Sequence, residues 1–190
     1  AALNQMAQKA SDTAFRLDSQ MSQYYQAISA FLEEKREGRP LGTYPQQERV
    51  LSSVRTLPIW VDVEIGWEEA EQTIKNLLDI LHELRMPMRE LADLDNEDAE
   101  DMWGSVGTMF TRLEEIRHNL QGLTLEPDQN TIYWVEIHPQ YLEINLNAAP
   151  LHIGTLMEKY LWFQKQSVIL TSATLTANGE FEYLRQRLDR

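Results

Sequence analysis

Small hydroxyl residues follow an apolar run near the C-terminal end of the sequence. Residues 167–175 read Ser-Val-Ile-Leu-Thr-Ser-Ala-Thr-Leu, and the run from Ser167 to Thr171 is typical of a strand buried in a parallel sheet. In an open α/β sheet, the ligand crevice lies beyond the carboxyl ends of the strands. Ser172 and Thr174 would therefore point into such a crevice, where they could bond a carboxylate, a water or a phosphate. The alternative is an ordinary turn in which the hydroxyls bond the local backbone.

Other catalytic signatures are missing from the sequence. The absence of cysteine excludes disulfides, thiolate zinc sites and thiol catalysis by this chain, and it fits a reducing, cytoplasmic compartment. There is no glycine-rich phosphate loop and no GxSxG nucleophile elbow. The histidines at 82, 118, 138 and 152 do not have metal-ligand spacing. We therefore expect no catalytic residue, no metal site and no cofactor in this chain.

The net charge of -13 is concentrated in one segment. Residues 58–101 contain 14 acidic and 3 basic residues, and the acids are densest between Glu90 and Asp101. This density predicts a solvated turn between two helices. A divalent-cation site is an alternative, although the acids lack the alternating spacing and the glycine of a calcium loop. A third interpretation is a surface that repels DNA and keeps a strand on the opposite face.

Three long helices are predicted by apolar residues that recur every three or four positions. The first seam predicts a helix over residues 2–37, which Gly38 and Pro40 end. Its members are Leu3, Ala7, Ala10, Ala14, Leu17, Met21, Tyr24, Ile28 and Phe31. A second seam runs from residue 60 to residue 88, and a third from residue 102 to residue 123. Stripes of this kind must pack against each other, which predicts an elongated antiparallel bundle over residues 1–124.

Local signals set the expected ends of these helices. Pro45 is expected to open a short helix that reaches Thr56, and Pro58 to restart the chain before the second long helix. Pro87 predicts that the second long helix frays near Arg85. The third is expected over residues 96–121, with Asp95 as its cap and Gly122 closing it.

The C-terminal third has a different character. Residues 131–137 and 141–146 predict a β-hairpin broken at residues 138–140, and a loop follows at 147–150. Residues 153–165 and those from about 180 onward are expected to be helical. A lone buried strand at 167–171 implies a sheet whose other strands are missing, or one that borrows the hairpin. The predicted fold class is mainly α, with a small α/β portion over residues 125–190.

Four segments of this portion resemble the region around motif III of DinG/XPD-type superfamily 2 DNA helicases. They are residues 147–154, 161–163, 167–176 and 179–185, and residues 134–136 resemble the strand that leads into them. The match covers residues 131–190, whereas the helical part matches only in character and place. In that family a helical arch is inserted between the DEAH motif and motif III. Residues 1–124 would then be the arch, and residues 125–190 would be a remnant of the first RecA-like motor domain.

The resemblance implies roles for individual residues. Ser172, Ala173 and Thr174 would form motif III, which couples the nucleotide site to DNA movement. ATP and magnesium would bind the parent protein outside this chain, and whether the parent holds an iron–sulfur cluster is left open. The chain begins without Met and stops inside an expected helix, so it looks excised from a longer protein. We expect no ATPase or unwinding activity from it alone.

The arch in this family borders the path of single-stranded DNA. The near-neutral first 57 residues are the better candidate for facing that strand, since they contain 7 basic and 6 acidic residues. The available phosphate partners are Lys9, Arg16, Lys35, Arg36, Arg39, Arg49 and Arg55, with Tyr24 and Tyr25 as stacking rings. The alternative is that these bases only solubilise a helix. We expect weak binding of single-stranded DNA that falls steeply with added salt.

The sequence leaves two hypotheses about function open. The first is a piece of a DNA helicase motor whose partners are single-stranded DNA and the remainder of the motor. The second is a non-enzymatic helical module for protein interaction, in which the Ser-Ala-Thr stretch is accidental. A metal-binding bundle built on the acidic segment is a third, weaker idea. No apolar run approaches the roughly 18 residues of a membrane span, so we expect no membrane partner.

Overall fold

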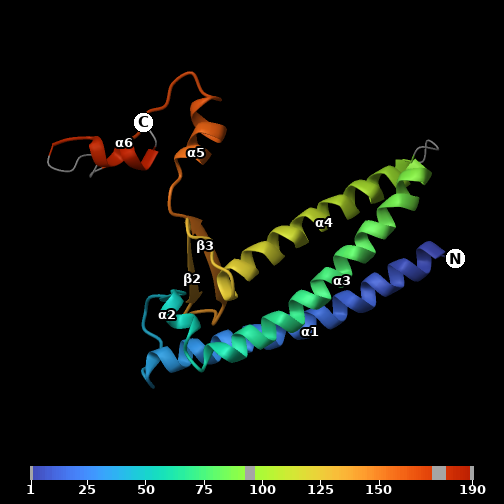
Figure 1. Ribbon diagram of the computed structural model, residues 1–190, viewed down its shortest axis with the longest axis horizontal. Coiled ribbons are helices and arrows are strands. Elements are labelled where there is room, and N and C mark those ends of the chain that lie inside the picture. Colours follow the sequence, from blue (N-terminus) through green and yellow to red (C-terminus); the bar gives the residue numbers. More distant parts are fainter. Residues whose placement is uncertain (1, 93–96, 173–178, 189–190) are drawn as a thin grey trace. The chain divides into compact units, whose positions relative to one another are not determined.

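A computed structural model describes residues 2–92, 97–172 and 179–188 (Figure 1). The chain divides into two compact units. The helical unit comprises Ala1–Asp128 and Tyr133–Ala148, and the C-terminal unit comprises Gln129–Ile132 and Ala149–Arg190. Among the described residues, no helix is both long enough and apolar enough to cross a membrane.

The first helix, α1 (Ala2–Arg36), confirms the first apolar seam. Tyr24, Ile28, Phe31 and Leu32 have no exposed surface, so the C-terminal end of the seam is fully buried. The chain leaves the helix through Glu37 and Gly38, which have φ angles of 53° and 78°. Glycine adopts this left-handed conformation without the steric cost of a Cβ atom, which explains why α1 ends here.

Two more long helices, α3 (Trp60–Ala92) and α4 (Glu97–Thr124), complete the bundle. Helix α3 packs against both α1 and α4, as the ribbon shows (Figure 1). Its fully buried residues include Trp60, Val63, Trp67 and Ala70, which repeat at the spacing predicted from the sequence. The prediction of a mainly α chain with three packed helices is confirmed.

Two predicted helix ends are wrong. Helix α3 continues through Pro87 to Ala92 instead of fraying near Arg85. Met88 lies beyond the proline and is buried with Leu81 and Leu84, and this packing holds the last turns in helical form. Helix α4 includes Gly122 and ends at Thr124, while the predicted cap, Asp95, lies outside the described residues.

The segment between α1 and α3 was expected to be helical from Pro45, and this prediction is also wrong. It forms strand β1 (Gln46–Arg49) and then only one short helix, α2 (Ser52–Arg55). Strand β1 pairs antiparallel with β2 (Thr131–Ile137), and Gln46 lies opposite Ile137. The pairing partner is distant in the sequence, so local periodicity could not reveal this strand.

The predicted hairpin is present, with a shifted second strand. Strand β3 (Ile144–Pro150) begins later than expected and continues through the predicted loop at 147–150. The strands form one small sheet in the order β1-β2-β3. Tyr133, Val135 and Ile137 alternate along β2 and are buried against the helices, so one face of the sheet belongs to the core of the bundle.

The C-terminal unit contains helix α5 (Gly154–Met157), a π-helical turn η1 (Glu158–Trp162) and helix α6 (Glu182–Leu188). These helices confirm the helical predictions for residues 153–165 and for the end of the chain. Residues 167–172 are irregular, so the predicted buried strand is absent from the described structure. Ile169 is 87% exposed there. A strand of this type needs neighbouring strands for its backbone hydrogen bonds, and the described part of this unit pairs no strand with residues 167–171.

Candidate nucleic-acid interface

Two of the predicted phosphate partners lie together on α1. Lys9 and Arg16 are exposed and line a shallow surface hollow with Gln5, Asp12 and Thr13. They are two helical turns apart, so their side chains project from the same face of the helix. Neither forms a salt bridge within the described residues, which leaves both available to an anionic ligand.

Three more of the predicted phosphate partners lie at the C-terminal end of α1. They are Lys35, Arg36 and Arg39, and we refer to them as the basic cluster. They line a second surface hollow together with Gln46 of β1. Arg36 donates to Gln46 Oε1 over 3.1 Å and lies 3.6 Å from a Glu33 carboxylate oxygen. Arg39 pairs with Glu37 over 3.0 Å, and both of these side chains are more than 70% exposed. Because exposed ion pairs contribute little free energy, a phosphate could displace Glu37 from Arg39.

Arg49 and Arg55 differ in their surroundings. Arg49 is exposed on β1. Arg55 donates to the backbone oxygens of Val50, Gly122 and Leu123 over 3.0, 3.1 and 2.8 Å. Burial lowers the pKa of Arg55, and the Tyr133 ring lies 5.9 Å from its guanidinium carbon. Arg55 therefore clamps the carbonyl end of α4, where a cation also favours the helix dipole.

Buried side chains tie the same end of α4 to the other helices. The hydroxyls of Tyr24 and Thr124 are 2.7 Å apart, and Trp60 Nε1 donates to the Thr124 carbonyl over 3.1 Å. Trp67 Nε1 donates to Gln121 Oε1 over 2.7 Å. Desolvation raises the pKa of the Tyr24 phenol, whose residue has no exposed surface. The prediction that Tyr24 stacks on a base is wrong, whereas Tyr25 is 36% exposed.

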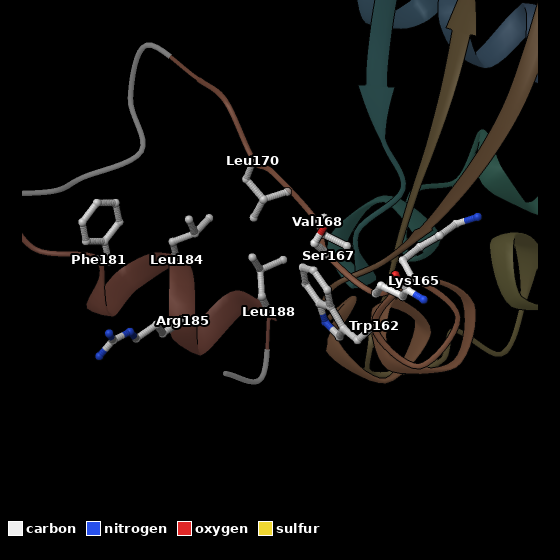
Figure 2. A pocket seen from close by; sticks show the side chains of 10 residues that line it. Trp162, Lys165, Ser167, Val168, Leu170, Phe181, Leu184, Arg185 and Leu188 are labelled. Atoms are coloured by element: carbon white, nitrogen blue, oxygen red, sulfur yellow. The ribbon is translucent and has the colours of Figure 1, made fainter.

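The motif III residues fall only partly within the structure. Ser172 is exposed in an irregular segment, and Ala173 and Thr174 lie outside the described residues. A hollow of about 430 Å³ in the C-terminal unit is lined by residues from the preceding segment and from α6. In Figure 2, Leu170, Leu184 and Leu188 face this space, while the charged ends of Lys165 and Arg185 point away from it. The hollow therefore has a mixed lining, in which leucine side chains lie beside polar residues such as Gln166 and Ser167.

The described residues do not bring together the side chains that commonly hold a metal ion. Within the described parts of the chain, no group of three or more His, Cys, Asp or Glu residues could hold a metal ion. Part of the acidic segment, residues 93–96, lies outside that search. The sequence has no glycine-rich loop for a triphosphate, so the residues present do not fit ATP.

The sequence analysis did not predict two features of the helical unit, which are the contacts of Arg55 and the aromatic stack at the hairpin turn. The role of Arg55 was not found because its acceptors are backbone oxygens of a distant helix, which no side-chain pattern marks. The sequence analysis also placed His138 in a break and Tyr141 in a strand. In the structure their rings stack at the turn of the hairpin, with centroids 5.3 Å apart. The sequence feature that could have indicated this stack is the pair of rings on either side of Pro139, between the two predicted strands.

Two known proteins are similar to parts of the chain. The 3'-5' exonuclease DinG of Bacillus subtilis is 35% identical over 78 residues, which are 40% of this chain and 8% of that protein. The ATP-dependent DNA helicase DinG of Photobacterium profundum is 25% identical over 133 residues, which are 67% of this chain and 19% of that protein. The chain is homologous, over part of its length, to DinG proteins.

This homology confirms the resemblance to the DinG helicases that the sequence motifs indicated. The chain spans 8% and 19% of the lengths of these two DinG proteins, so it corresponds to a small part of each. No family model matches the chain, and no solved structure matches it significantly.

Proposed function

We propose that this chain is a segment of a DinG-type, ATP-dependent DNA helicase. Residues 1–124 are its arch, which borders the path of single-stranded DNA. Residues 125–190 belong to the first motor domain, where Ser172, Ala173 and Thr174 couple ATP hydrolysis to DNA movement. The observation that carries the proposal is the similarity to a DNA helicase DinG over 67% of the chain.

The exposed apolar surface of the C-terminal unit supports the motor-domain assignment. Ile169 and Phe163 are 87% and 79% exposed, and Leu170 is 41% exposed. A monomeric domain rarely leaves such side chains in water unless another surface covers them. Further strands of a parallel sheet would cover them and would give residues 167–171 the strand partners that they lack here.

The distribution of charge supports the arch assignment. The phosphate-facing candidates lie on α1 and around β1, whereas most of the acidic excess lies on α3 and the start of α4. A strand passing near α1 meets Lys9, Arg16 and the basic cluster, and the acidic segment repels it from α3. ATP and magnesium bind outside these residues, and all chemistry on the nucleotide belongs to that part of the motor.

A 3'-5' exonuclease is the second candidate function for the parent protein. The Bacillus subtilis relative with this activity shares the higher identity, 35%, although over a shorter stretch. The described residues contain no group of three or more His, Cys, Asp or Glu side chains that could hold the metal ions common in nucleases.

One assay on the intact parent protein separates these functions. Partial duplexes with either a 5' or a 3' single-stranded tail are incubated with and without ATP, and strand displacement and shortening of the 3' end are measured together. The helicase proposal predicts ATP-dependent displacement with intact strands. Shortened strands without displacement would establish the exonuclease instead. Neither activity, together with retention of a specific protein partner, would favour a helical interaction module.

A further inference from the structure

The turn between β2 and β3 presents an exposed aromatic pair. The rings of His138 and Tyr141 stack with centroids 5.3 Å apart and an angle of 24° between their planes. Tyr141 is 73% exposed, while His138 is half-buried. His138 therefore supports one side of the tyrosine ring, and most of the tyrosine remains accessible to solvent.

The backbone holds this pair in a tight turn. The His138 amide donates to the Glu143 carbonyl over 3.0 Å, and the Leu142 amide donates to the His138 carbonyl over 2.8 Å. Leu142 adopts a φ of 53°, which is rare for a side chain of this size. It is also 65% exposed, so burial of Leu142 does not offset the strain. Strained turns that present exposed side chains are often binding sites.

The pairing of the strands brings this turn near the basic cluster. Gln46 lies opposite Ile137, the last residue of β2 before His138. The Gln46 side chain accepts a hydrogen bond from Arg36 and donates to the Leu32 carbonyl over 3.1 Å. One strand residue therefore connects the hairpin turn to the hollow lined by Lys35, Arg36 and Arg39. All these residues belong to the helical unit.

We propose that this hairpin turn is a base-stacking site for single-stranded DNA, in which Tyr141 stacks on a base and the basic cluster binds the adjoining phosphates. Aromatic rings beside a cationic groove are the usual means of holding single strands without reading sequence. The supported ring loses little freedom on binding, which favours affinity. The acids Glu33 and Glu37 compete with phosphate for two of the arginines, and the phosphate contacts make binding salt-sensitive. This inference rests on the proposed function, because it names a contact on the same DNA path.

Fluorescence of a single-stranded oligonucleotide containing 2-aminopurine tests the site in the intact parent protein. Binding to the wild type should quench the fluorescence, because the modified base stacks on an aromatic ring. Tyr141→Ala should weaken DNA affinity by roughly five- to 100-fold, the range measured when a stacking ring is removed. Tyr141→Phe should retain both the affinity and the quenching. Tyr160→Ala is the matched control, since Tyr160 is also exposed, at 60%, but belongs to the C-terminal unit.

The outcomes separate this site from the proposed function. If the parent unwinds DNA while Tyr141→Ala and Tyr160→Ala bind the oligonucleotide as well as the wild type does, the stacking site is wrong and the helicase proposal stands. If Tyr141→Ala weakens binding but ATP-dependent displacement is absent from the wild type, the site stands and the helicase proposal fails. Failure of the wild type to bind single-stranded DNA would overturn the site. Unchanged circular dichroism of Tyr141→Ala shows that a loss of affinity does not reflect unfolding.

Discussion

Single residues at the end of α4 determine how closely the sheet approaches the bundle. A Cβ atom added at Gly122 would lie 2.9 Å from Cζ of the Tyr133 ring and closer still to its hydroxyl oxygen. Tyr133 is buried on β2 and cannot easily move away. This glycine was predicted to close the helix, but its role in the structure is to make room for the ring.

We predict that Gly122→Ala destabilises the helical unit by about 1–3 kcal/mol, the usual cost of overpacking a buried contact. Denaturant unfolding followed by tryptophan fluorescence measures this, because Trp60 and Trp67 lie in the core of the unit. Gly104→Ala is the matched control on the same helix, since nothing lies within 4 Å of its added Cβ. The control should be neutral or stabilising by up to about 1 kcal/mol. Equal effects of the two substitutions would contradict the close approach of Tyr133.

At the scale of elements, the sequence predicted what repeats locally and missed what depends on distant partners. The seams of α1, α3 and α4 repeat every three or four residues, and all three helices are present. Strand β1 was missed because its partner, β2, is far away in the sequence. Helix α3 was expected to fray near Arg85 because of Pro87, but the packing of Met88 outweighs the lost hydrogen bond.

The candidate interface was also predicted where its residues depend on local spacing and missed where they depend on distant partners. The positions of Lys9 and Arg16 on one helix face follow from their spacing, whereas the burial of Tyr24 and the clamp of Arg55 depend on the end of α4. No pattern in the residues around Tyr24 or Arg55 indicates these contacts. The aromatic stack at the hairpin turn was missed for a related reason, because the second strand was expected to start at Tyr141 and begins at Ile144.

The clamp between α2 and α4 makes an element-scale prediction. Arg55→Met removes the donors to the carbonyls of Gly122 and Leu123 and should destabilise the unit by about 2–4 kcal/mol. Arg49→Met, at an exposed position on β1, should change stability by less than about 0.5 kcal/mol. The shift of the denaturation midpoint measures both. A midpoint for Arg55→Met that matches the Arg49→Met control would show that the clamp does not stabilise α4.

At the scale of the whole molecule, the near-neutral helix α1 differs in charge from the acidic helix α3. Lys9 and Arg16 lie on α1, and the basic cluster lies at its C-terminal end. Gln46, which lines the same hollow as the basic cluster, pairs with Ile137, the last residue before the hairpin turn. Helix α3 is strongly acidic. If the helical unit borders single-stranded DNA as proposed, the strand should touch α1 and the turn and avoid α3, although the chain as a whole is acidic.

Photocrosslinking of single-stranded DNA to the intact parent protein shows directly whether the strand contacts α1 and the hairpin turn. A halogenated uracil is placed in the strand, and the crosslinked peptides are mapped by mass spectrometry. We predict crosslinks to α1, to the basic cluster at its C-terminal end and to Tyr141, and their loss as salt is raised. Crosslinks on the acidic face of α3, or crosslinks to the parent with none in this chain, would contradict it.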